Sequence, residues 1–95
     1  MVTLNVGTKE ILSFDITDRL GGISSLDDYN VEMKVVTEDE ATTKVQWTTV
    51  FNTTGMRVDM LLDTAAWAEG TYKAYVRVNI NPELPILGPF EFGLS

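Results

Sequence analysis

The sequence predicts an all-β domain of the sandwich type with about seven strands. Three observations support this fold class. Apolar and polar residues alternate with a period of two along most of the chain, which is typical of strands with one buried face. Clusters of Gly, Pro, Asn, Asp and Ser separate the alternating segments, as turns do. The length of 95 residues suits one domain, so we expect a single domain over residues 1–95, with a small barrel as the structural alternative.

The first half of the chain contains three alternating segments. They cover residues 2–6, 12–16 and 30–35. A turn at residues 7–9 separates the first two, and a longer loop with a glycine pair and a serine pair follows the second. The acidic run at residues 38–40 is expected to form a turn after the third strand.

The second half contains four more segments. They cover residues 45–51, 56–62, 72–79 and 86–92, with a hairpin connection at residues 52–55. Before the sixth strand the alternation breaks, and we expect a short helical turn that Asp63 or Thr64 caps and Gly70 ends. Pro89 has no amide hydrogen to donate, so the last strand is expected to be bulged or to lie at a sheet edge.

The alternation also predicts which side chains fill the space between the two sheets, because a strand turns every second side chain to the same face. The predicted core consists of Leu12, Phe14, Val31, Met33, Val35, Val45, Trp47, Val58, Met60, Tyr72, Ala74, Val76, Phe90 and Phe92.

The composition removes much of the usual catalytic chemistry. The sequence contains neither Cys nor His, which excludes thiolate nucleophiles, disulfides, and imidazole bases or ligands. Nothing in the pattern places two carboxylates across one cleft, and no glycine-rich phosphate loop occurs. We therefore expect no enzyme activity, no catalytic residues and no cofactor.

The charge and the hydropathy pattern limit the partners. The sequence has 14 acidic and 7 basic residues, and its net charge of −7 repels nucleic-acid phosphates. No apolar run reaches the length of a membrane-spanning helix, so neither nucleic acid nor membrane is expected as a partner. The chain begins without a basic and apolar leader, which predicts synthesis in the cytoplasm; a domain excised from a larger protein is the competing interpretation.

One loop raises the question of calcium, since four aspartates flank it and hard cations prefer oxygen ligands. These residues are Asp15, Asp18, Asp27 and Asp28. The spacing of an EF-hand is absent, so solvated turn carboxylates are the favoured interpretation and no metal site is predicted.

The segment from Asp63 to Ala74 resembles the E–F corner of immunoglobulin-like domains. In that corner a Tyr near the start of strand F bonds back to upstream backbone. The resemblance implies an immunoglobulin-like sandwich in which Tyr72, Asp63 and Trp67 form a structural corner. Ala74 occupies the position of the disulfide Cys, and Trp47 does not lie on the third strand, so the resemblance is to the general architecture and not to antibody domains.

Three short motifs carry a second resemblance that spans most of the chain. They are FDITD at residues 14–18, GTYKAYV at residues 70–76 and PILGPFEF at residues 85–92. The chain is similar in these motifs to the immunoglobulin-like modules of tailed-phage capsid decoration, baseplate and tail proteins. The resemblance implies a structural part of a virion, with no catalytic residues to carry over.

These observations lead to an expected function. A short, acidic, single domain of this kind is expected to be a capsid decoration or cement protein, or another accessory protein, that docks on other subunits of the assembled virion. The alternatives are a tail or baseplate adaptor and a carbohydrate- or surface-binding module of a larger bacterial protein. Weak self-association through edge strands is also expected. The candidate interface residues are Tyr75, Arg77, Leu84, Ile86 and Leu87.

Overall fold

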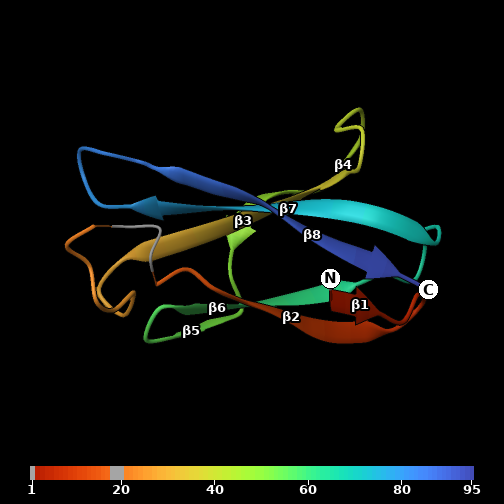
Figure 1. Cartoon of the computed structure of the whole chain (residues 1–95), viewed down its shortest axis with the longest axis horizontal. Coiled ribbons are helices and arrows are strands. Elements are labelled where there is room, and N and C mark those ends of the chain that lie inside the picture. The colour runs from red at the N-terminus through yellow and green to blue at the C-terminus, as the bar shows by residue number, and fades with distance from the viewer. Residues whose placement is uncertain (1, 18–20) are drawn as a thin grey trace.

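The computed structural model describes residues 2–17 and 21–95 and shows a sandwich of two β-sheets (Figure 1). The strands are β1 (Val2–Leu4), β2 (Lys9–Asp15), β3 (Asn30–Thr37), β4 (Thr43–Thr49), β5 (Asn52–Thr54), β6 (Arg57–Asp63), β7 (Gly70–Asn79) and β8 (Ile86–Leu94). The larger sheet has the order β1-β8-β7-β3-β4, and the smaller sheet has the order β2-β6-β5. The prediction of an all-β, two-sheet fold is confirmed.

The count of described strands is eight, where about seven were expected. The additional strand is β5, which the sequence interpretation treated as part of a hairpin connection. Its three residues pair with β6, from Asn52 opposite Asp59 to Thr54 opposite Arg57. The turn that joins the two strands is therefore shorter than expected and centres on Gly55, whose φ of 58° favours glycine.

The core lies between the two sheets and follows the alternation of the strands. On β7, for example, Tyr72, Ala74, Val76 and Val78 are buried while the residues between them are partly exposed. All but one of the side chains predicted for the core are buried or packed against it. Phe14 and Phe90 are among the partly buried ones, and their rings stack across the two sheets with centroids 4.7 Å apart.

Trp47 is the exception, and a β-bulge explains why. Met33 on β3 pairs with Thr48, whereas Val35, two residues on, pairs with Val45, so β4 contains one extra residue at this point. One extra residue reverses the alternation of the side chains that follow. The indole consequently lies beside Lys34 and Arg77 on the outer face of the larger sheet and not among the residues of the core.

The prediction of a helical turn before the sixth predicted strand is also wrong. Between β6 and β7 the chain makes a single turn, in which the Trp67 amide bonds to the Thr64 carbonyl at 3.0 Å. No helix occurs in the described part of the chain, and therefore none long and apolar enough to cross a membrane. Thr64 is bound to the β1–β2 turn and β7 already begins at Gly70, which leaves too few residues to offset the cost of helix nucleation.

The last strand has the irregularity that Pro89 predicts. Ala74 pairs with Phe90 but Val76 pairs with Leu87, so β8 bulges outward from β7 around Gly88 and Pro89. Gly88 has a φ of 126°, and a Cβ at this position would lie 2.9 Å from the Ala74 carbonyl oxygen. Only glycine fits there without displacement of backbone.

The loop between β2 and β3 contributes Leu26 to the core, a residue that strand alternation does not predict, whereas Ile16 continues the alternation of residues 12–16. Leu26 is fully buried, and its amide bonds to the Gly55 carbonyl at 2.9 Å. Ile16, also fully buried, bonds to the Met56 carbonyl at 2.9 Å. The loop is therefore fixed to the β5–β6 turn both at its start and near its end.

Candidate interaction surface

The predicted corner residues lie together between β6 and β7. The Tyr72 hydroxyl donates a hydrogen bond to the Ala68 carbonyl at 2.6 Å, and its ring packs against Trp67 with centroids 5.2 Å apart. The Asp63 carboxylate accepts a hydrogen bond from the Ala65 amide at 3.2 Å. These contacts close the turn on itself, which gives the three residues a structural and not a chemical role.

The sequence indicates Thr64 only as a candidate helix cap, and its role in joining two turns of the structure was not predicted. It is 1% exposed, and its hydroxyl accepts a hydrogen bond from the Gly7 amide at 3.0 Å. The same hydroxyl lies 3.3 Å from the Asn5 carbonyl and 3.2 Å from the Thr8 carbonyl, to which it donates. Thr64 therefore joins the β1–β2 turn to the end of β6. The sequence signal for this role was a polar residue in the segment where the alternation of apolar and polar residues is interrupted.

The outer face of the larger sheet collects aromatic and charged side chains on its three neighbouring strands β7, β3 and β4. Arg77 donates from Nε to Glu32 Oε1 at 2.8 Å, and its guanidinium carbon lies 4.4 Å from the centroid of the Trp47 ring. Lys34 approaches the same ring, with Nζ 6.0 Å from the centroid. We call this surface, which also includes Lys73, Tyr75 and Glu40, the Trp47–Arg77 face.

The β3–β4 hairpin completes this face from above the sheet (Figure 1). Glu40 at its tip accepts a hydrogen bond from the Tyr75 hydroxyl at 2.8 Å and forms an ion pair with Lys73 at 3.5 Å. Its φ of 61° is uncommon for a residue other than glycine. The hydrogen bond to Glu40 raises the pKa of Tyr75, and both burial and the carboxylate charge act in the same direction. Tyr75 is thus a neutral hydrogen-bonding group at physiological pH.

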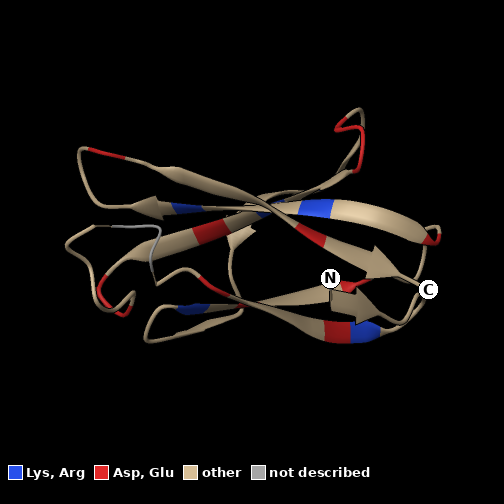
Figure 2. Cartoon of the chain, in the orientation of Figure 1, with Lys and Arg blue, Asp and Glu red and all other residues tan. Residues whose placement is uncertain are grey.

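The charges of the molecule are unevenly placed (Figure 2). Every Lys and Arg in residues 2–17 and 21–95 lies on a strand, whereas many of the acidic residues lie in the connections. Three of these cations, Lys34, Lys73 and Arg77, are on the Trp47–Arg77 face, where Glu32 and Glu40 pair with two of them. This face is therefore far less acidic than a chain of net charge −7 would suggest.

The predicted interface residues divide into two groups. Tyr75 and Arg77 lie on the Trp47–Arg77 face. Ile86, on β8, pairs with Arg77 of β7 and is 58% exposed. Leu84 is 47% exposed in the β7–β8 connection. Leu87 instead packs against the core, because alternation along β8 turns it away from Ile86. The apolar patch expected from Leu84, Ile86 and Leu87 is consequently reduced to the first two.

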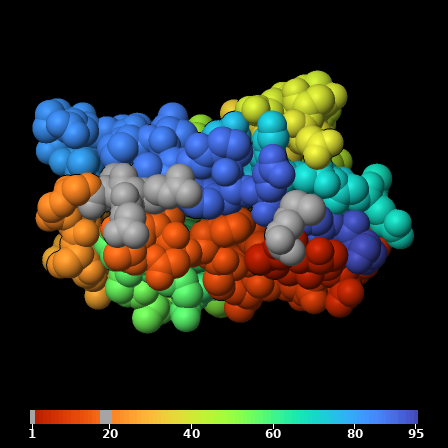
Figure 3. Space-filling view, in the orientation of Figure 1, coloured from red at the N-terminus to blue at the C-terminus, as the bar shows by residue number. Residues whose placement is uncertain are grey.

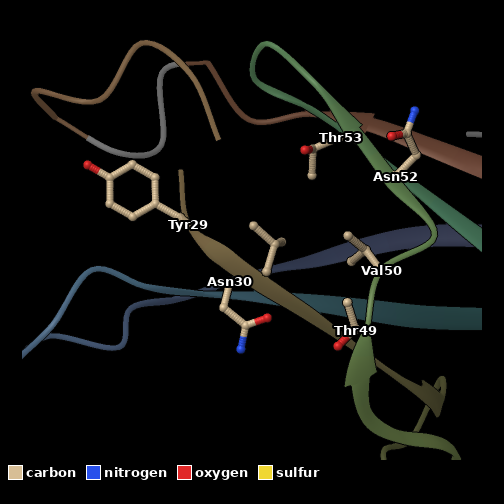
Figure 4. A pocket seen from close by; sticks show the side chains of 7 residues that line it. Tyr29, Asn30, Thr49, Val50, Asn52 and Thr53 are labelled. Atoms are coloured by element: carbon tan, nitrogen blue, oxygen red, sulfur yellow. The ribbon is translucent and has the colours of Figure 1, made fainter. Parts of the chain in front are cut away.

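A shallow open pocket of about 200 Å³ lies at the end of the sandwich where β3, β4 and β5 meet (Figure 4). Its lining consists of Tyr29, Asn30, Val31, Thr49, Val50, Asn52 and Thr53. These side chains offer amides and hydroxyls but no carboxylate or amine for acid–base chemistry. Tyr29 is the one aromatic residue in this lining, and neither tryptophan belongs to it.

The aspartates considered for calcium do not form a described site. Among the described residues no group of three or more acidic side chains is close enough to hold a metal ion. Asp15 instead accepts hydrogen bonds from the amide and the hydroxyl of Thr17, which lower its pKa. Asp18, the fourth aspartate of that interpretation, lies outside the described residues.

A buried carboxylate, that of Asp59, lies on the smaller sheet. Asp59 accepts a hydrogen bond from the Ser13 hydroxyl at 2.6 Å and another from Arg57 Nε at 3.1 Å. The hydrogen bond from Ser13 is the main reason that the pKa of Asp59 is lowered, and Arg57 adds to the shift. Asp59 is thus a charged, paired group that joins β2 to β6.

Comparisons of the chain with family models, with curated proteins and with solved structures find no match.

Proposed function

We propose that this domain is a docking module, an accessory structural protein of a tailed-phage virion that binds subunits of the assembled particle through the Trp47–Arg77 face. The observation that carries the proposal is the convergence of Trp47, Tyr75 and Arg77 on one face. Trp, Tyr and Arg are the residue types that dominate the binding energy of protein interfaces. Within this class we favour a capsid decoration protein, with a tail or baseplate adaptor as the alternative.

The face is held in place before any partner arrives. Arg77 is fixed by Glu32 and by the Trp47 ring, and Tyr75 is fixed by Glu40. Side chains that are already ordered lose less conformational entropy on binding, so more of the contact energy remains as affinity. The three cations of the face outnumber its two carboxylates, which lowers the repulsion that an acidic chain would otherwise show toward an acidic partner.

The finer assignment to immunoglobulin-like domains belongs to the same proposal. It is supported by the hydrogen bond from the Tyr72 hydroxyl to Ala68, which lies upstream at the entry to β7, as in the corner of those domains. The phage context is supported by the sequence motifs and not by the geometry, because a fold does not fix a function.

The test compares binding to assembled particles and to unassembled shell subunits of the phage that encodes the chain, by cosedimentation. We expect the protein to bind particles much more tightly than free subunits, because several weak contacts act together on a symmetric shell. Trp47→Ala and Arg77→Ala should each weaken particle binding by roughly thirtyfold or more, as expected for interface residues worth at least about 2 kcal/mol.

Phe51→Ala is the matched control, because it removes a 59% exposed aromatic ring next to the smaller sheet, where the Phe51 amide bonds to the Asp59 carbonyl on β6. Its particle binding should be unchanged. Equal binding to particles and free subunits would contradict the decoration role. Loss of binding in the Phe51 variant but not in the Trp47 variant would assign the interface to the other sheet. Tight binding to a soluble oligosaccharide would favour the carbohydrate-recognition alternative.

A further inference from the structure

β2 is an edge strand of the smaller sheet, and no described strand pairs with its outer edge. It is a terminal strand of the order β2-β6-β5, and all seven of its residues pair with β6 without a register shift. Among the described strands the other sheet edges are less regular. The edge strands β1 and β5 have three residues each, and the edge strand β4 pairs with β3 through two register shifts. β2 also forms part of the molecular surface (Figure 3).

The backbone hydrogen bonds at the two ends of β2 define which groups face outward. The Ile16 amide bonds to the Met56 carbonyl, and the Thr64 amide bonds to the Thr8 carbonyl. In an antiparallel pair, residues alternate between those that bond to the neighbour and those that do not. The even-numbered residues of β2 therefore bond to β6, and the N–H and C=O groups of Lys9, Ile11, Ser13 and Asp15 point away from the sheet.

The side chains of these four residues form an outer surface with an apolar centre and charged ends. Ile11 is 50% exposed, and it pairs with Leu61, which is 43% exposed. Lys9 and Asp15 lie at opposite ends of β2, each three residues from Leu12. When two copies of β2 run antiparallel, the positive end of each strand therefore lies next to the negative end of the other.

We propose that β2 pairs with β2 of a second copy of this chain, antiparallel and about a two-fold axis at Leu12. In this register Lys9 of each copy lies opposite Asp15 of the other, and Ile11 lies opposite Ser13. Each outward backbone group within the strand then gains a partner, and the two smaller sheets become one continuous sheet. This contact uses a surface distinct from the Trp47–Arg77 face and does not depend on the proposed function.

Complementary charge selects this arrangement over the alternatives. A shift by two residues in either direction leaves Lys9 opposite Ser13 or a residue outside β2, and no longer opposite Asp15. An in-register parallel arrangement places Lys9 beside Lys9 and Asp15 beside Asp15, and like charges directly opposite are destabilising in a sheet. Identical edges with charges of one sign would repel each other, which is a common way of blunting an edge. β2 carries opposite signs at its two ends instead.

The dimer is expected to be weak. Each copy carries a net charge of −7, so two copies repel one another outside the contact. A single pair of edge strands also buries little surface compared with a stable interface. Self-association in solution should therefore be evident only at high protein concentration, or where copies are held close together.

The test is a charge exchange between two variants, measured by sedimentation equilibrium. Lys9→Glu alone and Asp15→Lys alone each place like charges opposite one another in the homodimer, so each should associate about tenfold more weakly than the unmodified chain. An equimolar mixture of the two variants restores both opposite-charge pairs. The mixture should dimerise at least as well as the unmodified chain, although both variants retain a net negative charge.

Two controls separate this result from general electrostatics and from unfolding. Lys44→Glu mixed with Asp28→Lys repeats the same charge changes away from β2, and should show no preference for mixed dimers. Ile11→Pro removes an outward N–H that β6 does not use, and proline is tolerated at such edge positions. This variant should keep its circular dichroism spectrum and lose self-association.

Hydrogen exchange on the unmodified chain provides a measurement without any substitution. The Ile11 and Ser13 amides should gain protection as the protein concentration rises. A monomer at all concentrations, or a dimer in which these amides stay unprotected, would overturn the proposal. A mixture of the two charge variants that associates no better than either one alone would overturn the antiparallel register.

Discussion

Thr64→Val tests whether the β1–β2 turn is held to β6 by a buried hydroxyl. Valine has nearly the same shape as threonine, so the substitution removes the hydroxyl and leaves no cavity. Two hydrogen bonds are lost: the one that the hydroxyl accepts from Gly7, and the one that its single hydrogen donates to Asn5 or Thr8. At a net value of about 0.5–1.5 kcal/mol for each bond, the loss is at most about 3 kcal/mol.

The structure places the expected loss in the lower part of that range. The Gly7 amide still bonds to the Thr64 carbonyl at 3.2 Å, and the Thr8 carbonyl still accepts from the Thr64 amide at 3.1 Å. The Asn5 carbonyl still accepts from the Thr8 hydroxyl at 3.0 Å. Because no former partner is left unsatisfied, we expect a decrease of about 1–2 kcal/mol in the free energy of unfolding. For a domain of this size that corresponds to a decrease in Tm of roughly 4–16 °C.

Urea titration followed by tryptophan fluorescence, together with thermal unfolding, measures this loss. Thr8→Val is the control, since the Thr8 side chain is exposed and its removal should change stability by less than about 0.5 kcal/mol. An unchanged midpoint for Thr64→Val would refute the reasoning, because it would mean that the hydroxyl contributes nothing. A loss above about 4 kcal/mol would refute it in the other direction, since it would require a buried polar group without a partner.

Two further substitutions test the corner and the β8 bulge, both by urea denaturation. Tyr72→Phe removes the hydrogen bond to Ala68 and should lower the free energy of unfolding by roughly 0.5–1.5 kcal/mol; an unchanged midpoint would argue against a stabilising corner. Gly88→Ala places a Cβ 2.9 Å from a backbone oxygen at a φ of 126°, and should cost at least about 2 kcal/mol. Gly21→Ala is its control, because a Cβ there meets no atom within 4 Å, and equal losses for the two variants would contradict the steric argument.

Most of the fold follows from the sequence because burial in a two-sheet structure has a period of two. The alternation on β7 identifies its buried residues correctly, and the strand breaks coincide with glycine, proline and acidic turns. On β6 the alternation assigns Asp59 to the outer face, yet Asp59 is buried there by its hydrogen-bond partners. The sequence pattern fails where the backbone departs from that period. Trp47 and Val45 have the spacing of two inward residues, but the extra residue in β4 separates them onto different faces. No residue type in that segment marks the bulge in advance.

The candidate surface is predicted only in part for the same reason. Tyr75 and Arg77 are assigned to an outer face because they alternate with buried neighbours, and the structure places them there. The sequence pattern does not identify the residues that these two side chains contact. Glu40 reaches Tyr75 from a hairpin 35 positions away in the sequence, and Trp47 reaches Arg77 through a bulge. Contacts between segments far apart in the chain depend on the register in which the strands pair. The local sequence pattern of either segment does not determine that register.

The parallel pairing of β1 with β8 determines the order in which the domain can be completed. Val2 pairs with Phe92, and the contact continues beyond the strands as the Ser95 amide bonds to the Leu4 carbonyl. During translation β1 leaves the ribosome long before β8 is made. β1 pairs with β8 alone among the described strands, so its backbone has no strand partner until β8 has been made, and β1 then adds to the free edge of β8. Contacts between the two ends of a chain have the largest loop-closure cost, so this step is expected to come late and to limit the folding rate.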